Sequence, residues 1–533
     1  MPGATTEGRA PVLVAGAWRP STGTDSFWAL NPATGERLGD YPVSDWAEID
    51  ACLTSAAEAA DASAVHDPAV LAAFLEAMAG ILDDRSSELV EIAHAETALP
   101  GSPRLAEGEL PRTTDQLRQA AEAARSRSWK RPVISPASRI ASMRESLPGV
   151  VCVFGPNNFP FAFNSIGGGD FAAAVATGHP VLGKANPGHP GTTRRLAESA
   201  AEAAAEAGLP PGFVQLVYRV HHSDGARLVA DPRVGATAYT GSRRAGLALK
   251  SAAEGAGNLM YLELSSVNPV VLLPGAWAER GSGVVEELVA SALNGTGQFC
   301  TSPGLIFVLG GPDTPAIRAA FTSALDAAPV GVLLGRGVAE GLAAATKTWS
   351  AAGATVITRA PAPGGPACRH PNTLMEVSGR SFLANRAALQ TEAFGNMSLL
   401  VICADIGELT RCLRALEGNL TGSVYSASDG RDDDAAVEVS QALRPRVGRL
   451  LNDKVPTGVA VVPAMNHGGP YPATGHPGFT AVGIPASLER FTMLQCFDNV
   501  RDHRLPLELR ADNPLGLVRS VDGVATAEPV TWG

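Results

Sequence analysis

The chain lacks the cysteine pattern of a disulfide framework or of a zinc site. It has seven cysteines among 533 residues, and no two of them form a CxxC pair. They are Cys52, Cys152, Cys300, Cys368, Cys403, Cys412 and Cys496. An odd and scattered set argues against paired disulfides and against a cysteine-ligated metal, so we expect no metal cofactor. Most free cysteines are small buried hydrophobic residues, so a cysteine with a chemical role must be recognised by its neighbours.

Two further absences restrict the location and the partners. No uninterrupted apolar run is long enough to span a bilayer, and the N-terminus, MPGATTEGRAPVLVAGAWRP, has no basic region followed by a long apolar one. The net charge is -11, and no basic stripe interleaved with aromatic residues is present, which argues against a nucleic-acid surface. We therefore predict a cytoplasmic protein that acts on small molecules and has neither a nucleic-acid nor a membrane partner.

The length and the hydrophobic pattern predict an α/β fold with more than one domain. A chain of 533 residues exceeds what one hydrophobic core supports. Ala-rich helical patterns fill residues 50–130, and short β-like runs alternate with helices over 150–262 and again over 264–460. This alternation predicts parallel sheets covered by helices on both faces. The Gly- and Pro-rich stretch NHGGPYPATGHPGF, residues 466–479, predicts a long shaped loop, and such loops are often functional.

The stretch NGTGQFCTSPG, residues 294–304, sets Cys300 in a glycine-rich bend. Glycines at 295, 297 and 304 allow the backbone to bend closely around the thiol. A cysteine acts as a nucleophile when its thiolate is accessible and stabilised. Burial as a structural cysteine is the alternative that this stretch alone leaves open.

Two more polar residues follow strand-like runs. Glu263 ends the apolar run in YLELSSVNP, where desolvation beside a pocket can raise the pKa of a carboxylate and make it a general base. Asn158, in FGPNNFPFAFN, can direct its amide NH2 at an anionic oxygen. The alternatives are an exposed charge at a strand end for Glu263 and an ordinary turn asparagine for Asn158.

A third region predicts a phosphate site. In ATAYTGSRRAGLAL a strand, the pair Gly241-Ser242 and a helix follow one another, so N–H groups at the helix N-terminus and the Ser242 hydroxyl can hold a pyrophosphate. The stretch lacks G-x-G-x-x-G, so its strand-turn-helix context carries the prediction. Lys184, which ends PVLGK one βαβ unit earlier, can reach a cofactor ribose or phosphate, or can be a surface lysine.

In residue type and order, these segments resemble the aldehyde dehydrogenase family. The matching motifs span nearly the whole chain: GPNNFP, VLGKANP, TGS at 240–242, LELSSVNP, NGTGQFC and EAFG at 392–395. The resemblance implies that Cys300 is the nucleophile, Glu263 the base for hydrolysis, and Asn158 an oxyanion donor together with the Cys300 N–H.

The same resemblance implies a cofactor site. Lys184 and Glu392 would hold ribose hydroxyls, and Gly241 and Ser242 would hold the pyrophosphate. Asn396 replaces the proline that usually follows EAFG, a change that can alter the loop that presents Glu392.

Longer segments resemble one branch of the family, the 2-oxoglutarate semialdehyde (2,5-dioxopentanoate) dehydrogenases and related NADP-linked enzymes. They are LELSSVNPVVLLPGA, GQFCTSPGLIFV, AETALPGSPRLAEGELPRTTDQL and HGGPYPATG. The branch implies NAD(P)-dependent oxidation of an aldehyde to a carboxylic acid through a cysteine thiohemiacetal and thioester. The first candidate substrate is 2,5-dioxopentanoate, and another aliphatic or aromatic aldehyde is the alternative. Phe163, Phe299 and Phe479 are candidates for the substrate pocket, or are ordinary packing residues.

The cofactor expectation rests on Pro187. It stands where many NAD-preferring members carry an acidic residue that binds the adenosine ribose. The absence of that carboxylate removes repulsion of a 2′-phosphate, so NADP is favoured and NAD remains possible. Arg219, His221 and His222 are candidates for the neighbourhood of that phosphate.

The resemblance also implies an α/β architecture with a Rossmann-type cofactor domain over 1–134 and 149–263 and a catalytic domain over 264–485. A small β element over 135–148 and 486–503 would join subunits into a homodimer or homotetramer, and 504–533 would be a C-terminal tail. The alternating apolar residues of RFTMLQCF suit pairing with a second subunit. Two alternative functions are acyl transfer to coenzyme A and a non-catalytic scaffold. Relatives that transfer the acyl group to coenzyme A typically lack the hydrolytic glutamate, so Glu263 argues against the first. A scaffold would not need Cys300, Glu263 and Asn158 together, so their presence argues against the second.

Overall fold

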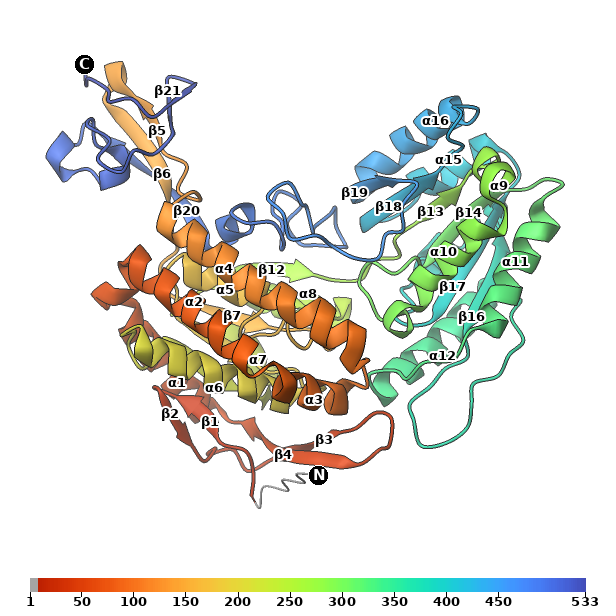
Figure 1. The fold of residues 1–533 in the computed structure, drawn as a ribbon, viewed down its shortest axis with the longest axis horizontal. Coiled ribbons are helices and arrows are strands. Elements are labelled where there is room, and N and C mark those ends of the chain that lie inside the picture. Colours follow the sequence, from red (N-terminus) through yellow and green to blue (C-terminus); the bar gives the residue numbers. More distant parts are fainter. Residues whose placement is uncertain (1–7) are drawn as a thin grey trace.

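Residues 8–533 of the computed structural model form two α/β bodies and a smaller sheet that projects from the first body (Figure 1). The first body contains a seven-stranded sheet with the strand order β12-β11-β7-β8-β9-β1-β2. Its strands are β1 (Val12–Val14), β2 (Ala17–Arg19), β7 (Val150–Phe154), β8 (Val181–Lys184), β9 (Val214–Val217), β11 (Val234–Thr240) and β12 (Leu259–Glu263). The five strands from β12 to β9 pair in parallel, and β1 and β2 add an antiparallel edge.

Helices cover this sheet, so its parallel strands are buried and read as continuous apolar runs such as VVCVF in β7. The helices are α1 (Trp46–Ala60), α2 (Pro68–Asp84), α3 (Ser86–Thr97), α4 (Leu110–Ser126), α5 (Gly169–Ala176), α6 (Pro190–Glu206), α7 (His222–Val229) and α8 (Arg243–Gly255). A π-helical segment, η2 (Gly101–Glu109), leads into α4. A separate three-stranded sheet, in the order β10-β4-β3, contains β3 (Ser26–Leu30), β4 (Arg37–Ser44) and β10 (Arg219–Val220).

The second body contains another seven-stranded sheet, in the order β15-β16-β17-β14-β13-β18-β19. Its strands are β13 (Val270–Leu272), β14 (Leu305–Leu309), β15 (Thr355–Val356), β16 (Thr373–Ser378), β17 (Met397–Cys403), β18 (Asn419–Tyr425) and β19 (Val447–Asn452). Its helices are α9 (Pro274–Arg280), α10 (Ser282–Leu293), α11 (Thr314–Ala327), α12 (Arg336–Ala351), α13 (Gly379–Ala384), α14 (Arg386–Leu389), α15 (Ile406–Arg414) and α16 (Asp433–Leu443).

Two cores lie on opposite faces of this second sheet. Val271 and Phe307 belong to one cluster, whereas their neighbours Val270 and Ile306 belong to the other. Successive side chains of a strand point to opposite faces, so a strand buried on both sides contributes to both cores. The α/β fold predicted from alternating strands and helices is therefore confirmed.

The carboxyl ends of the parallel strands bring distant segments to one edge of the first sheet. Phe154 of β7 pairs in register with Lys184 of β8, and Thr240 of β11 pairs with Glu263 of β12. Ligands of open α/β sheets bind beyond this edge. Figure 1 shows that β12 runs from the first body toward the second, so its last residue, Glu263, faces the junction between them.

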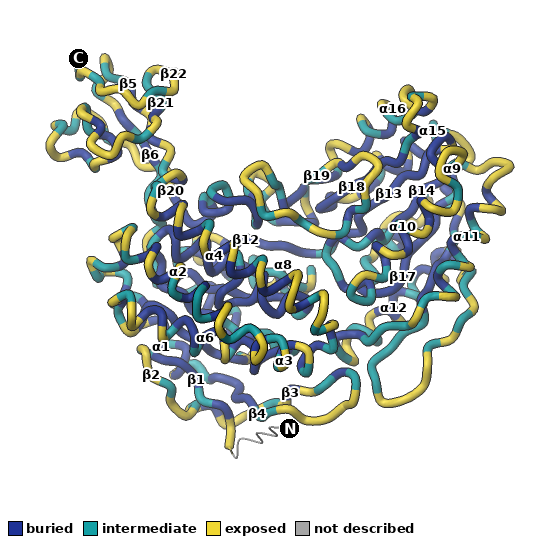
Figure 2. Tube along the Cα trace, in the orientation of Figure 1, coloured by how far each residue is buried: buried dark blue, intermediate teal, exposed yellow. Residues whose placement is uncertain are grey.

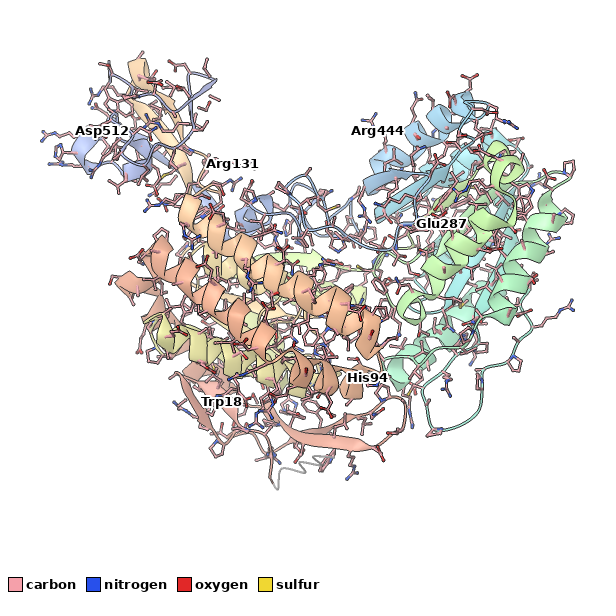
Figure 3. All side chains as sticks on the ribbon, viewed as in Figure 1. Trp18, His94, Arg131, Glu287, Arg444 and Asp512 are labelled. Atoms are coloured by element: carbon pink, nitrogen blue, oxygen red, sulfur yellow. The ribbon has the colours of Figure 1, made fainter. Side chains whose placement is uncertain are left out.

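The projecting sheet has five strands in the order β20-β6-β5-β21-β22. They are β5 (Val133–Ser135), β6 (Ile140–Ser146), β20 (Thr492–Asp498), β21 (Arg519–Val521) and β22 (Val524–Thr526). Arg131 lies where this sheet meets the first body (Figure 3), and its guanidinium pairs with Glu489 at 2.5 Å. The expectation of a C-terminal tail over 504–533 is wrong for this part of the chain. The segment supplies β21 and β22 because Leu505 and Leu509 are buried against the apolar face of β5 and β6.

The surface reflects this construction. Figure 2 shows buried backbone through the two bodies and mostly intermediate and exposed backbone in the projecting sheet. Leu494 of β20 is 70% exposed, although its strand alternates apolar residues. Among the helices of residues 8–533, none is both long and apolar enough to cross a membrane.

Candidate active site

The bend around Cys300 follows α10 and depends on glycine at two positions. Gly297 has φ +71°, and a Cβ there would overlap the carbonyl oxygen of Gly395. Gly295 has φ +56°, and a Cβ there would lie 2.7 Å from the ring of Phe299. Positive φ with no room for a side chain requires glycine. The bend therefore packs directly on the loop that carries Glu392.

The segment after Glu263 holds the Cys300 loop in place. The side-chain amide of Asn268 donates to the carbonyl oxygens of Cys300 at 2.8 Å and of Ser302 at 2.9 Å. The side-chain oxygen of Asn419, Oδ1, in turn accepts from the backbone N–H of Val267 at 2.8 Å. Buried amide networks of this kind fix the relative position of segments because each partner satisfies another.

The long loop over 466–479 runs along the edge of β12. The Leu264 N–H donates to the carbonyl oxygen of Ala473 at 2.8 Å, and Glu263 forms a bridge with Thr474. At the start of the loop, the His467 N–H donates to the Thr480 hydroxyl at 2.8 Å. These backbone contacts bring His467 beside the end of β12.

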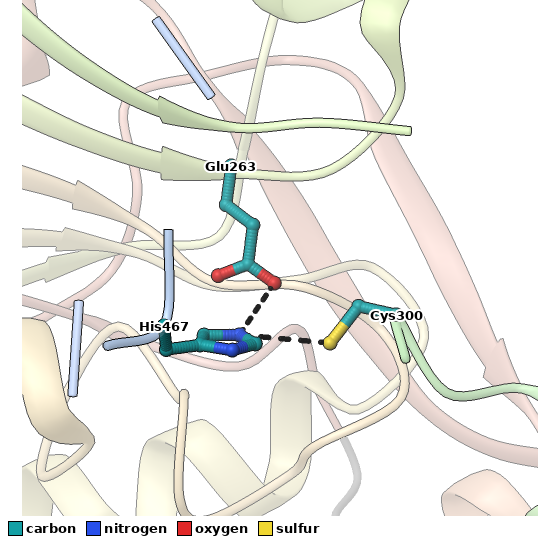
Figure 4. Close-up of side chains that lie close together, drawn as sticks. All are labelled: Glu263, Cys300 and His467. Carbon is teal, nitrogen blue, oxygen red and sulfur yellow. Dashed lines mark hydrogen bonds and ion pairs between the residues drawn. The ribbon is translucent and has the colours of Figure 1, made fainter. Parts of the chain in front are cut away.

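Glu263, Cys300 and His467 therefore meet from three segments (Figure 4). The His467 Nε2 lies 2.9 Å from Glu263 Oε1 and 3.7 Å from the Cys300 Sγ. The sulfur, an imidazole nitrogen and a carboxylate oxygen all lie within 4.8 Å of one another. One imidazole nitrogen faces both partners, so it serves them in turn: with a free lone pair it can accept the thiol proton, and the N–H so formed can donate to the Glu263 carboxylate.

Burial and charge set the protonation states of this group. Burial, followed by the charge of Glu263, raises the pKa of the Cys300 thiol well above its ordinary value. Burial alone would raise the pKa of Glu263, but the neighbouring His467 and the thiol hydrogen bond outweigh it and lower that pKa overall. The resting group therefore pairs a protonated thiol with an ionised carboxylate. A base must remove the thiol proton before the sulfur can act as a nucleophile.

A cavity of about 630 Å³ opens on Cys300 between the two bodies. Six of the seven residues predicted from the sequence line it: Asn158, Gly241, Ser242, Glu263, Cys300 and Glu392. Lys184 is not among the lining residues. Its Nζ lies 5.5 Å from the centre of the Phe154 ring at the end of β8, and burial together with the charge of Arg219 lowers its pKa to about 8.

Asn158 is buried beside the Cys300 loop. Its side-chain amide donates to the Gln298 carbonyl oxygen at 2.9 Å, two residues before the cysteine. Within residues 8–533 the Cys300 N–H has no hydrogen-bond acceptor. Both groups are donors next to the sulfur, and their role toward an oxyanion stays a prediction.

Glu392 faces the same cavity, with a pKa raised to about 7 by burial. The loop that carries it is held by Asn396, whose side-chain amide donates to the His370 carbonyl oxygen at 2.8 Å and to the Asn372 side chain at 2.9 Å. The asparagine therefore anchors this loop by hydrogen bonds in the place of a proline.

His467 is the site residue that the sequence prediction missed. The Gly- and Pro-rich loop was predicted to be functional, but no residue in it was selected. A histidine next to a Gly-Gly pair, where the backbone can approach another segment closely, is the signal that singles it out.

A cysteine thiol beside an imidazole and a carboxylate, at a nucleotide-sized cavity between two α/β bodies, defines an enzyme that works through a covalent thiol intermediate. The chain belongs to the aldehyde dehydrogenase family, whose sequence pattern matches residues 18–470. Enzymes of this family oxidise aldehydes with NAD or NADP.

Relatives of this chain are found in bacteria. Alpha-ketoglutaric semialdehyde dehydrogenase 2 of Azospirillum brasilense is 38% identical over 516 residues, which is 93% of this chain and 96% of that protein. Alpha-ketoglutaric semialdehyde dehydrogenase of Acinetobacter baylyi is 36% identical over 470 residues, 85% of this chain and 86% of that protein. The fold is also that of lactaldehyde dehydrogenase from Escherichia coli, with a TM-score of 0.79, 21% identity and coverage of 92% of this chain and 98% of that one.

Proposed function

We propose that this protein oxidises 2,5-dioxopentanoate to 2-oxoglutarate, with NADP as the hydride acceptor. The observation that carries the reaction type is the contact of Cys300, His467 and Glu263 at the cavity between the two bodies. The substrate is proposed from the two relatives named for the same semialdehyde. Oxidation of another aliphatic or aromatic aldehyde is the second candidate.

The residues around the cavity fit a nicotinamide dinucleotide. Ser242 caps α8 by accepting from the Ala245 N–H at 3.4 Å, and the N–H groups of Arg243 and Arg244 have no acceptor within residues 8–533. Such a helix end attracts a pyrophosphate. We assign Gly241 and Ser242 to that pyrophosphate and Lys184 and Glu392 to ribose hydroxyls. When bound, the cofactor accepts the hydride that leaves the aldehyde carbon.

The first chemical step generates the nucleophile. His467, in the tautomer that carries its proton on Nδ1, takes the proton from Cys300 Sγ on Nε2, and the Nε2–H so formed can donate to the Glu263 carboxylate. The sulfur then attacks the aldehyde carbon to form a thiohemiacetal. The negative charge that develops on the aldehyde oxygen is stabilised by the Asn158 side-chain amide and the Cys300 N–H. Donors already held in place by the surrounding backbone stabilise this charge without reorganising during the reaction.

Loss of hydride leaves a thioester on Cys300, which water must cleave. Glu263 removes a proton from that water, the hydroxide attacks the thioester carbon, and the carboxylic acid departs as the thiol takes back a proton. The lowered pKa of Glu263 keeps the carboxylate ionised at neutral pH, as a base requires.

The His467 imidazole is expected to set the pH range of activity. In a His467→Phe variant, burial acts on Glu263 without the opposing imidazole, so the Glu263 pKa rises and the ionised base is lost at a higher pH. The acid limb of the kcat/KM profile should move upward by about one pH unit or more. His467→Gln keeps a hydrogen-bond donor without a cationic form, so its shift should be smaller. An unchanged acid limb in both variants would remove His467 from this role.

NADP preference is expected to depend on Arg219. The side chain of Arg219 is exposed, and its charge lowers the pKa of Lys184. Pro187, three residues after Lys184, has no carboxylate that would repel a 2′-phosphate. Arg219→Ala should raise KM for NADP about tenfold and leave KM for NAD nearly unchanged, because only NADP carries the phosphate. The matched control is His221→Ala, since His221 lies 3.4 Å from Asp25. Equal changes for both cofactors in Arg219→Ala would contradict this assignment.

The domain organisation is proposed on the same basis. We assign the first body to cofactor binding, the second to catalysis, and the projecting sheet to assembly of a homodimer or homotetramer. The exposed apolar side chains of β20, Met493 and Leu494, support the last assignment because an uncovered strand of this kind can pair with another chain.

One assay tests the proposed function directly. The purified protein is mixed with 2,5-dioxopentanoate and either NADP or NAD, with and without coenzyme A, and the reduced nicotinamide is followed. We expect reduction without coenzyme A and release of 2-oxoglutarate. Activity on other aldehydes only would favour the second candidate, and strict dependence on coenzyme A would contradict a hydrolytic role of Glu263.

A further inference from the structure

Three phenylalanine rings pack together beside Cys300: Phe299 from the cysteine's own loop, and Phe159 and Phe163 from the segment after β7. Phe159 lies 5.1 Å from Phe163 and 5.3 Å from Phe299, measured between ring centres, and none of the three lines the cavity of about 630 Å³. Phe163 in turn lies 5.7 Å from the His467 ring. Phe479 is not part of this group and packs on Tyr261 at 5.4 Å. The rings therefore form an aromatic cluster (Phe159, Phe163 and Phe299) next to the reacting groups.

Arg104 and Arg112 lie over rings of this aromatic cluster, and Arg449 contacts Met465, which packs against it. Two of these three arginines have hydrogen-bond partners. Arg104 pairs with Glu109 at 2.5 Å and donates to the Asn158 carbonyl oxygen at 3.3 Å. Arg449 donates to the carbonyl oxygens of Pro456 at 2.8 Å and Gly458 at 3.0 Å. The terminal nitrogens of these two guanidinium groups therefore have acceptors, although the Nε of each is buried without one within residues 8–533.

Arg112, in the first turn of α4, has no such partner. Its guanidinium lies over the Phe163 ring at 5.3 Å and at 6.0 Å from the Phe159 ring centre. Nε and Nη2 are buried, and no acceptor for them exists within residues 8–533. Glu109, three residues before Arg112, is occupied by Arg104 and by the N–H groups of Phe161 and Ala162. Arg112 is thus a largely buried cation without an anion.

Burial of an unpaired guanidinium is unfavourable. Desolvation lowers the pKa of Arg112 overall, although the negative charges of Glu109 and Glu263 oppose that effect, so this side chain lies within electrostatic range of the reacting group. Stacking on two phenylalanine rings offsets part of the desolvation. A guanidinium also binds a carboxylate through two parallel hydrogen bonds, an interaction that stacking leaves available.

We infer that Arg112 determines substrate specificity by binding the carboxylate at the far end of the aldehyde, while the aromatic cluster contacts the carbon chain between them. The inference rests on the proposed function and names its substrate class: short aldehydes that carry a carboxylate at the other end. In 2,5-dioxopentanoate four carbon–carbon bonds separate the two groups, a span of roughly 5 Å.

The test compares an anionic and a neutral substrate in the full-length enzyme. Arg112→Met keeps the length and apolar volume but removes the charge. It should lower kcat/KM for 2,5-dioxopentanoate by about a hundredfold, mainly through KM, and change kcat/KM for pentanal by less than about threefold. Arg112→Lys should recover part of the loss. The matched control is Arg118→Met on the same helix, which removes a half-exposed ion pair with Asp83.

A second measurement separates this inference from the proposed function. Glutarate should inhibit pentanal oxidation competitively in the unaltered enzyme and lose that effect in Arg112→Met, whichever semialdehyde is the substrate. If the unaltered enzyme does not oxidise 2,5-dioxopentanoate, but glutarate inhibits it and does not inhibit Arg112→Met, the proposed substrate is wrong and the role of Arg112 is supported. Equal losses for pentanal and 2,5-dioxopentanoate, or equal glutarate inhibition in both proteins, would overturn the role of Arg112.

Discussion

Replacing Cys300 by alanine is expected to lower turnover by roughly 10⁴-fold or more, because no other side chain at the cavity can form the thiohemiacetal. The nucleophile is needed before hydride can leave, so both the first turnover and the steady state should disappear. Rapid mixing with substrate and cofactor, followed at the absorbance of reduced nicotinamide, measures both.

The alanine variant should still fold and still bind the cofactor. Cys300 holds its loop through its backbone, whose carbonyl accepts from Asn268, and that contact does not require the sulfur. Thermal denaturation with and without NADP therefore serves as the control. A variant that binds NADP normally and turns over at even a hundredth of the original rate would contradict a covalent mechanism on this thiol.

Replacing Glu263 by glutamine is expected to separate the two halves of the reaction. Hydride transfer should still occur once per active site, because the thiol can still be deprotonated by His467, but the thioester should then persist. The steady-state rate should fall by about 10²–10⁴-fold, the usual contribution of a general base. We expect the time course of reduced nicotinamide to show a burst close to one reduced cofactor per subunit, followed by near-zero turnover.

The same variant makes a prediction about the thiol. Burial is the main cause of the raised Cys300 pKa, and the charge of Glu263 adds to it. With that charge removed, the Cys300 pKa should fall, so alkylation by iodoacetamide should begin at a lower pH than in the unaltered enzyme. Glu392→Gln is the contrasting variant, since it should alter KM for the cofactor and leave thioester hydrolysis intact. Normal turnover of Glu263→Gln at neutral pH would exclude Glu263 as the base.

Much of the architecture was predictable because it depends on local pattern. Buried parallel strands such as VVCVF and the helices between them have periodicities that can be read directly, and the α/β fold is confirmed. The C-terminal segment was predicted incorrectly as a tail. Its strands are short, and Leu505 and Leu509 become a core only when they meet Ile134 and Ala141 from the other end of the chain.

Candidate site residues were predictable where a motif surrounds them. Cys300, Glu263 and Asn158 each stand in a short stretch whose glycines, strand or turn already indicate a special backbone position, and all three line the cavity. His467 stands beside a Gly-Gly pair, but nothing in its stretch indicates its partner, and Arg112 lies in an ordinary helical pattern. The role of His467 depends on its hydrogen bond to Glu263, 204 positions away in the sequence.

The sequence by itself determined the alternation of strands and helices, the family, and the residue types available for thiol chemistry. Only the tertiary structure decided which of those residues share a proton and which cation lacks an anion. The physical reason is that proton sharing and desolvation act over a few ångströms between segments that the chain order separates. At Cys300 that proximity pairs the thiol with an imidazole, and at Arg112 it leaves a guanidinium to be matched by the substrate.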